Sequence, residues 1–250
     1  MGRTVLLPRP PQRIVSLVPS QTELLNDLGL NTSVVGITKF CIHPSTWRNH
    51  KVIVGGTKNF QLDVIEKLKP DLILGNKEEN SKEKIESLCE RYPVWMSDIF
   101  NLDDALVMIK AIATINEKSK EGEVIAQKIA KNFSELKKLA MKSVLYLIWR
   151  EPWMTVGKNT FIDAMLESIG LRNIVKDQRY PAITLEEMKQ LSPQYVFLSS
   201  EPYPFKDIHQ RELKKTLPES KIILVDGEMF SWYGSRLIKA PDYFRTLKLD

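Results

Sequence analysis

Residues 62–74 read LDVIEKLKPDLIL, and residues 185–197 read LEEMKQLSPQYVF. In both stretches an acid follows the first leucine, and apolar residues lie eight, five and two places before a proline. Apolar residues spaced three apart share one face of a helix, and the apolar run after each proline is typical of a buried strand. Each stretch therefore predicts a helix that leads through a proline into a strand.

A second pair of similar segments occurs in the same order, LLNDLGL at residues 24–30 and MLESIGL at residues 165–171. Chance similarity is the alternative explanation, because amphipathic helices resemble one another. Two pairs in the same order favour an internal duplication. The sequence therefore predicts two similar lobes built from strands and helices.

Short apolar strands alternate with helical stretches along most of the chain. This alternation predicts an α/β fold of two Rossmann-like β/α lobes, with parallel sheets covered on both faces. After the first strand, Ser20 to Glu23 match a capping box that begins a helix. The expected strands are 13–18, 34–37, 51–54, 71–74, 94–96, 144–148, 195–198 and 222–225.

One segment is predicted to form a longer helix. Its apolar residues recur at steps of three and four, and they are Ile125, Ile129, Phe133, Leu136 and Ala140. A helix of about 21 residues is roughly 30 Å long and can join two domains. We expect an N-terminal lobe over 13–118, a linking helix over 119–141 and a C-terminal lobe over 142–250. A cleft between such lobes is a favoured place for a ligand.

Composition and charge narrow the range of partners. Apolar residues make up 43% of the 250 residues, charged residues make up 27%, and the net charge is +5. Lysines are mixed with acids and form no basic stripe, so we expect no nucleic-acid partner. We also expect a monomeric protein. No apolar run reaches the roughly 18 residues that a membrane helix needs.

Two questions stay open at the level of sequence. The first residues, MGRTV, lack the apolar core of a signal peptide. The protein is then periplasmic or otherwise extracytoplasmic if a signal was trimmed, and cytoplasmic if Met1 is close to the native start. Cys41 and Cys89 either pair or remain as two buried thiols.

Four stretches together resemble a known family. They are RIVSLVPSQTE at 13–23, LKPDLIL at 68–74, VGKN at 156–159 and LSPQ at 191–194. The chain resembles the helical-backbone class of ABC-transporter solute-binding proteins, which includes receptors for vitamin B12, haem and ferric siderophores. Within that class it looks most like the B12-binding members, and the resemblance runs from about Arg13 to Leu247.

The resemblance implies one acid on each lobe that docks onto arginines of a membrane permease. The matching positions are Asp63 and Glu186, which the internal repeat also makes equivalent. Carboxylates suit guanidinium forks. The alternative is two solvated acids near helix N-termini, where the helix dipole favours them.

Ligand-binding residues are expected in the loops that follow the strands. The positions that match the family's pattern are Phe40, Thr57, Asn76, Ile148 and Tyr180. In the B12-binding relatives several of these positions hold aromatic rings that pack on the corrin. Here Thr57, Asn76 and Ile148 depart from that pattern.

Two other loops combine aromatic residues with arginine, WREPWM at 149–154 and FSWYGSR at 230–236. Flat rings suit a planar macrocycle, and arginines suit propionates or a phosphate. The alternative is that Trp149 and Trp153 fill the core of their lobe. These loops add five candidate ligand-binding residues, Arg150, Trp153, Trp232, Tyr233 and Arg236.

No resident metal, cofactor or reaction is expected. His43, His50 and His209 share no ligand spacing, and an axial haem ligand from residues 41–43 is less favoured than a buried cysteine beside a surface histidine. A nucleophile elbow, a P-loop and a dinucleotide fingerprint are all missing from the sequence. A nitrogenase-like enzyme of two lobes would need more cysteines than two.

We therefore expect the solute-binding component of an ABC importer, which passes its cargo to the permease subunits. The expected cargo is a small-molecule metal chelate, namely cobalamin or another corrinoid, or alternatively haem or a ferric siderophore. The other open function is a cytoplasmic corrinoid or haem chaperone, or a sensor, of the same fold.

Overall fold

The structure is a computed structural model that describes residues 4–138, 141–247 and 249. It divides into two compact units. Unit 1 comprises Met1–Ile99, Asp103–Ala130 and Tyr233–Ile238, and unit 2 comprises Phe100–Leu102, Lys131–Trp232 and Lys239–Asp250. Among the described helices, none is long and apolar enough to cross a membrane.

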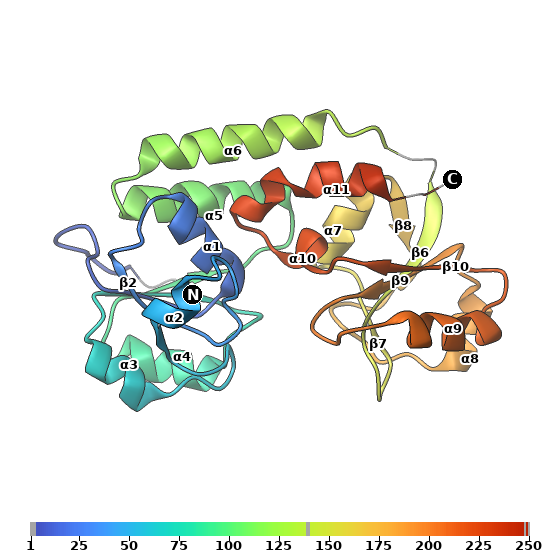
Figure 1. Cartoon of the computed structure of the whole chain (residues 1–250), viewed down its shortest axis with the longest axis horizontal. Coiled ribbons are helices and arrows are strands. Elements are labelled where there is room, and N and C mark those ends of the chain that lie inside the picture. The colour runs from blue at the N-terminus through green and yellow to red at the C-terminus, as the bar shows by residue number, and fades with distance from the viewer. Residues whose placement is uncertain (1–3, 139–140, 248, 250) are drawn as a thin grey trace. The chain divides into compact units, whose positions relative to one another are not determined.

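Unit 1 contains a five-stranded parallel sheet in the order β3-β2-β1-β4-β5. Buried apolar side chains of the sheet pack against α3 and α4 on one face, and these helices contribute Ile65 and Ile85 to that cluster. Figure 1 shows α1 and α5 on the opposite face. The strands are β1 (Ile14–Ser16), β2 (Val34–Ile37), β3 (Val52–Ile53), β4 (Leu72–Asn76) and β5 (Val94–Ser97). The helices are α1 (Pro19–Asp27), α2 (Trp47–His50), α3 (Leu62–Leu68), α4 (Lys82–Cys89) and α5 (Leu102–Ile115), with a 3₁₀ turn η1 (Ser235–Ile238).

Unit 2 contains a sheet in the order β10-β9-β6-β7, with β8 paired to β6. Its core joins the sheet to α8 and α9 through Met188 and Leu213, and Figure 1 shows α7 and α10 on the other face. The strands are β6 (Lys142–Trp149), β7 (Met154–Thr155), β8 (Leu171–Asn173), β9 (Tyr195–Ser199) and β10 (Lys221–Val225). The helices are α7 (Phe161–Ser168), α8 (Leu185–Leu191), α9 (Asp207–Thr216), α10 (Glu228–Ser231) and α11 (Ala240–Thr246).

The expected α/β fold with parallel sheets is confirmed, apart from one short strand. Strand β7 runs antiparallel to β6. It contains only Met154 and Thr155, which is too short to give a recognisable strand pattern. Each of the eight expected strands corresponds to a strand of the structure.

The repeated stretch folds alike in both units. The central apolar residues of the two helices, Ile65 in α3 and Met188 in α8, are fully buried. Each helix then ends in a left-handed residue, Lys69 with φ 46° and Ser192 with φ 44°. A left-handed residue after the last turn is a common way to end a helix. It turns the chain into the proline and the strand that follows, as the repeat predicts.

The linking helix is shorter than expected. Helix α6 covers Ser119–Ser134 rather than 119–141, and residues 139–140 of the expected range lie outside the described part of the chain. The boundary between the two units falls inside α6, between Ala130 and Lys131.

The expected C-terminal lobe, 142–250, also differs from unit 2, because residues 233–238 belong to unit 1. This segment packs closely on α1. A Cβ atom on Gly234 would lie 2.3 Å from the carbonyl oxygen of Ser20, so the close approach needs a glycine. Leu237 of the same segment is fully buried.

The capping box expected at Ser20 to Glu23 is not formed. Helix α1 begins two residues earlier than this box predicts, at Pro19, and its N-cap is Val18, which makes no side-chain cap. Proline fits the first turn of a helix because its missing N–H would have no partner there. The polar residues of this stretch are therefore inside the helix, where they are buried.

Candidate functional site

The predicted ligand-binding residues belong to both units. Phe40, Thr57, Asn76, Tyr233 and Arg236 lie in unit 1, and Arg150, Trp153, Tyr180 and Trp232 lie in unit 2. Most of them follow the carboxyl end of a strand, as expected for a parallel α/β sheet. Ile148 differs, because it is the next-to-last residue of β6 and is only 9% exposed.

Asn76 ends β4 and organises the loop that follows it. Its Nδ2 donates to the Ser97 hydroxyl at 3.0 Å, and its Oδ1 accepts from the backbone N–H groups of Glu78 and Glu79 at 2.8 and 3.2 Å. The side chain is 2% exposed. A buried amide whose donor and acceptor are both used stabilises the loop.

The buried residues of α1 extend this polar network. Gln21 donates to the Ser97 hydroxyl at 2.7 Å. The Thr22 hydroxyl donates to the Val18 carbonyl oxygen at 2.9 Å and lies 3.0 Å from the sulfur of Cys41. Burial raises the pKa of the Cys41 thiol, so this cysteine stays protonated at neutral pH. Cys41 and Cys89 do not pair with each other.

Tyr233 and Arg236 are both buried in unit 1, at 5% and 7% exposure. The guanidinium of Arg236 donates two hydrogen bonds to Glu23, at 2.7 and 2.8 Å. The Tyr233 hydroxyl donates to the Glu79 carboxylate at 2.8 Å. Burial and the nearby Glu79 raise the pKa of Tyr233 well above its ordinary value. Both predicted ligand contacts therefore hold carboxylates of their own unit.

Phe40 is the most accessible of the predicted residues in unit 1. It follows β2, and it is 51% exposed, with the Lys39 ammonium 5.0 Å from its ring centroid. Thr57 is half-buried, and its carbonyl oxygen accepts from Asn80 at 2.9 Å. An exposed ring with a cation beside it offers a ligand a flat apolar surface next to a positive charge.

In unit 2, Trp153 packs against the core cluster. Its ring stacks on Phe205, with centroids 5.9 Å apart and planes within 4° of each other. The Arg150 guanidinium lies 5.6 Å from the Trp153 centroid and donates to Glu212 at 2.9 Å. For Trp153, the structure agrees with the alternative that the ring fills the core of its lobe.

The more accessible tryptophan of this loop is Trp149. Its side chain is 40% exposed, and its ring meets the edge of Tyr203 at 5.7 Å. The Tyr203 hydroxyl is bonded in turn to His209 at 3.2 Å. Tyr203 was not among the predicted site residues. The run EPYPF at 201–205, directly after β9, is the sequence signal that could have identified it.

Trp232 is held by a buried acid. It is 6% exposed, and its Nε1 donates to Glu201 at 2.9 Å, while the Ser231 hydroxyl donates to the same oxygen at 2.7 Å. Burial raises the pKa of Glu201. The remaining predicted residue, Tyr180, is half-buried.

The two predicted docking acids are both exposed near helix N-termini. Asp63 in α3 has 72% of its side chain exposed and lies 3.8 Å from Lys67. Glu186 in α8 has 70% exposed and lies 3.6 Å from Lys189. Ion pairs as exposed as these are weak, so both carboxylates remain available to a partner.

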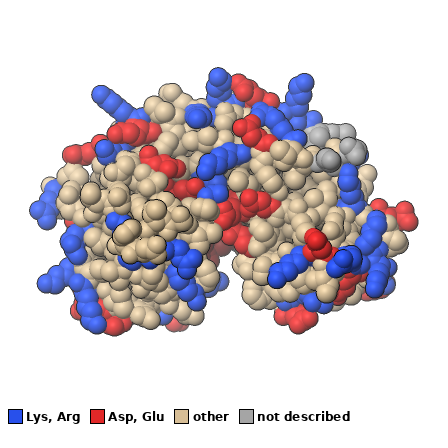
Figure 2. Space-filling model, in the orientation of Figure 1, with Lys and Arg blue, Asp and Glu red and all other residues tan. Residues whose placement is uncertain are grey.

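No group of three potential metal ligands occurs among the described residues. His209 is 8% exposed, and its Nδ1 accepts from the Lys206 backbone N–H at 2.9 Å. Figure 2 shows basic and acidic side chains interspersed over the face in view, as the mixed charges of the sequence predict.

Residues 14–220 match the model of the family described as periplasmic binding protein. This match covers most of the chain, so the chain belongs to that family. It is 25% identical over 257 residues to an uncharacterized ABC transporter substrate-binding lipoprotein of Bacillus subtilis, YvrC, covering 96% of this chain and 81% of the relative.

Two solved structures show the same fold. The periplasmic vitamin B12-binding protein of Vibrio cholerae aligns with a TM-score of 0.82 and 20% identity, over 95% of this chain and 96% of that one. The periplasmic haem-binding protein RhuT of Roseiflexus sp. RS-1 aligns with a TM-score of 0.80 and 19% identity, over 93% and 97% of the two chains.

Proposed function

We propose that this protein is the solute-binding component of an ABC importer and that its cargo is a corrinoid, haem or a related iron chelate. The observation that carries the proposal is the family match over residues 14–220, on a chain whose two units both place aromatic residues after their strands. The relatives named above support the importer role because one is an ABC transporter substrate-binding lipoprotein. That name also favours an extracytoplasmic protein over a cytoplasmic chaperone or sensor.

Accessible aromatic rings are the residues best suited to hold such a cargo. In unit 1 this is Phe40, and in unit 2 it is Trp149 together with the half-buried Tyr180. Arg150 is the arginine better suited to a charged edge of the ligand, because 27% of its side chain is exposed. We assign structural roles to Asn76, Trp232, Tyr233 and Arg236, because their polar atoms bind partners within the same unit.

Delivery needs a second set of residues. We propose that Asp63 and Glu186 dock onto basic residues of the permease, since both lie at equivalent positions of the repeat and have most of their side chains exposed. Removing both carboxylates should then abolish stimulation of the transporter without changing cargo affinity.

A binding screen tests the cargo. The probes are cyanocobalamin, cobinamide, haemin and ferric siderophores, followed by absorbance, thermal shift and calorimetry. We expect one of the planar macrocycles to bind with submicromolar affinity, because each aromatic contact adds about 0.5–1.5 kcal/mol beyond the burial of its area. If only a ferric siderophore binds, the proposed cargo becomes a ferric siderophore in place of a planar macrocycle. The absence of binding by every probe at high micromolar concentration would contradict the proposed cargo.

A further inference from the structure

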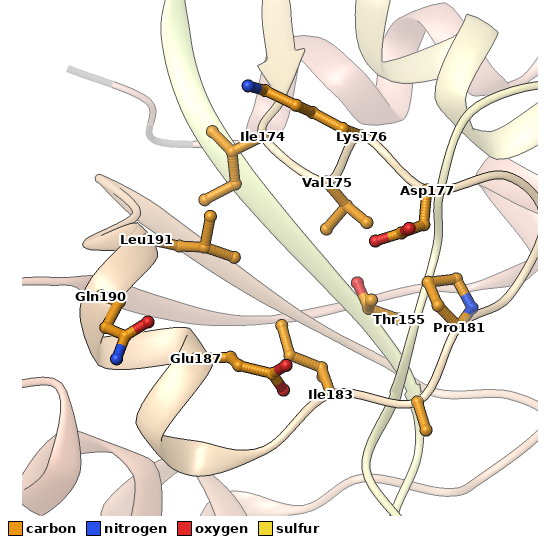
Figure 3. Close-up of a pocket in the computed structure, with 11 residues that line it drawn as sticks. Thr155, Ile174, Val175, Lys176, Asp177, Pro181, Ile183, Glu187, Gln190 and Leu191 are labelled. Atoms are coloured by element: carbon orange, nitrogen blue, oxygen red, sulfur yellow. The ribbon is translucent and has the colours of Figure 1, made fainter.

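A cavity of about 360 Å³ lies beside α8 in unit 2. Figure 3 shows the side chains that line it, among them the apolar Val175 and Ile183 and the charged Asp177, Glu187 and Lys176. Because acids and a base line the same cavity, its charge favours no single class of ligand. The aromatic surface around Trp149 is more informative, since it contains a hydroxyl group whose proton has a defined direction.

That hydroxyl belongs to Tyr203, which follows β9 and is half-buried. Its ring packs against those of Trp149 and Phe205, with centroids 5.7 and 4.7 Å away. The hydroxyl oxygen lies 3.2 Å from Nε2 of His209 and also forms a hydrogen bond with the Arg150 side chain. The donor in each of these two bonds decides where the Tyr203 proton can go.

The backbone fixes the tautomer of His209. Its Nδ1 accepts from the Lys206 backbone N–H at 2.9 Å, and because an amide N–H can only donate, Nδ1 carries no proton. The neutral imidazole then carries its proton on Nε2. The ring is 8% exposed, and edge contacts with Tyr203 and Phe205 hold it in this orientation. His209 is therefore the donor to the Tyr203 oxygen.

Arg150 is also a donor, because a guanidinium has five N–H groups and no acceptor. Burial lowers the pKa of Arg150, but the hydrogen bond with Tyr203 and the nearby charge of Glu212 raise it above its ordinary value. The Tyr203 oxygen thus accepts from two donors, one of them cationic. Over the described residues, 4–138, 141–247 and 249, no protein group accepts the Tyr203 proton in return.

A phenol in this position suits an anionic oxygen. Hydrogen bonds in a chain polarise one another, so a Tyr203 oxygen that accepts twice makes its own O–H a stronger donor. Donation to a carboxylate is charge-assisted and roughly twice as strong as donation to a neutral group. Arg150 adds its positive charge, which Glu212 balances only from a side chain that is 41% exposed. Trp149, 40% exposed, offers a flat face beside this donor.

We propose that Tyr203 selects the cargo by donating its hydroxyl proton to a carboxylate at the edge of a planar ring that packs on Trp149. This inference rests on the proposed function and narrows its cargo to a ring with free carboxylates, such as haem with its propionates. A corrinoid with amide side chains offers only neutral oxygens to the same donor. His209 acts through Tyr203 and is a positioning residue.

The first experiment needs no cargo. The nitrogen chemical shifts of the His209 ring, measured by NMR on the isotope-labelled protein, should show a protonated Nε2 and an unprotonated Nδ1. The opposite tautomer would make Tyr203 the donor to His209, leave no proton for a ligand and overturn the inference.

Two small probes test the ligand chemistry, 2-naphthoate and 2-naphthamide, which share a flat ring and differ in charge. Each is titrated into the labelled protein and followed through the NMR signal of the Trp149 indole N–H. Naphthoate should bind about tenfold more tightly, as expected when a hydrogen bond gains a charged acceptor. Equal affinities for the two probes would overturn the preference for a carboxylate.

Tyr203→Phe keeps the ring and removes the hydroxyl. It should weaken naphthoate about tenfold and leave naphthamide within about twofold, because only naphthoate gains from the charge-assisted bond. A general loss of structure would weaken both probes. Tyr92→Phe is the matched control in unit 1 and should leave both affinities unchanged. Equal naphthoate affinity in wild type and Tyr203→Phe would overturn the inference.

The same variant connects the probes to the cargo. Haemin should bind Tyr203→Phe about tenfold more weakly than wild type, and cobinamide should bind wild type more weakly than haemin does. Tighter binding of cobinamide than of haemin would overturn the narrowing of the cargo to carboxylate-bearing rings. If every cargo probe fails to bind while the naphthoate results hold, the proposed cargo is contradicted and the donor role of Tyr203 is not.

Discussion

The two units share one plan, but their aromatic and arginine side chains differ in exposure. In unit 1, polar side chains bind one another, and Arg236 and Tyr233 are 7% and 5% exposed. In unit 2, Trp149 is 40% exposed, and Arg150 has 27% of its side chain exposed. Residues of the same type therefore differ in accessibility, because some are bound by partners within their own unit and others remain open to solvent.

The two helices that carry the proposed docking acids, α3 and α8, also differ. Helix α8 begins with a complete capping box between Thr184 and Glu187, whereas α3 has Gln61 as its N-cap and no side-chain cap. A good N-cap stabilises a helix by about 1 kcal/mol. The exposed carboxylate of Glu186 therefore lies on the better-capped of the two helices.

The two arginines provide the largest expected contrast. Arg236→Met removes the guanidinium that donates two hydrogen bonds to the buried Glu23 carboxylate, and breaking a buried ion pair costs about 3–5 kcal/mol. Arg150→Met removes a more exposed pair with Glu212, and such pairs contribute about 1 kcal/mol or less. Urea unfolding of the two variants measures both free energies.

A companion variant separates the pair from the packing of its side chains. Arg236→Met combined with Glu23→Gln should recover part of the lost stability, because no uncompensated charge then remains buried. If Arg236→Met and Arg150→Met lose equal amounts of unfolding free energy, the two arginines do not differ in the way that their exposure indicates.

The sequence predicted the elements whose pattern is local. The spacing around Pro70 and Pro193 identified both copies of the repeated helix, and their central residues, Ile65 and Met188, are fully buried. It did not predict that residues 233–238 belong to unit 1. Arg236 and Glu23 are 213 positions apart, and a pair so distant leaves no periodic signal in the chain.

The candidate site could be predicted only in part for the same reason. Loop position and residue type identified Trp153, Trp232 and Arg236, but their exposure depends on partners elsewhere, such as Phe205 and Glu201. Nothing local distinguishes Trp149 from Trp153, which lie four residues apart. The contacts of the folded unit decide which ring remains accessible.

Cargo binding provides a contrast of intermediate size. Trp149→Ala should lower cargo affinity by up to about tenfold, the equivalent of one aromatic contact. Trp232→Phe keeps the buried ring but removes the donor to Glu201. It should therefore change the free energy of unfolding but leave the cargo affinity within about twofold of wild type. Calorimetry with the probe identified by the binding screen measures both affinities.

Phe40→Ala is the counterpart in unit 1 and should weaken the same probe, since 51% of that side chain is exposed. A loss of affinity in Trp232→Phe as large as in Trp149→Ala would assign the buried ring to the ligand and contradict the structural role proposed for it.

The smallest expected effect is a pH dependence that comes from Glu201. Burial raises the pKa of this carboxyl in the folded protein above its ordinary value of 4.5, and Glu228 and Asp226 raise it further, while bonds from Ser231 and Trp232 lower it. The unfolded chain therefore loses this proton at a lower pH than the folded protein does. The contribution of Glu201 to stability is complete below pH 4.5 and decreases as the pH rises through the folded pKa.

Glu201→Gln keeps an oxygen acceptor for Trp232 and has no proton to lose, so it should remove this decrease. The difference in unfolding free energy between wild type and variant, measured in urea from about pH 4 to 8, should shift in favour of the variant as the pH rises. A difference that stays constant, or that shifts in favour of wild type, would show that Glu201 is not held in a protonation-sensitive site.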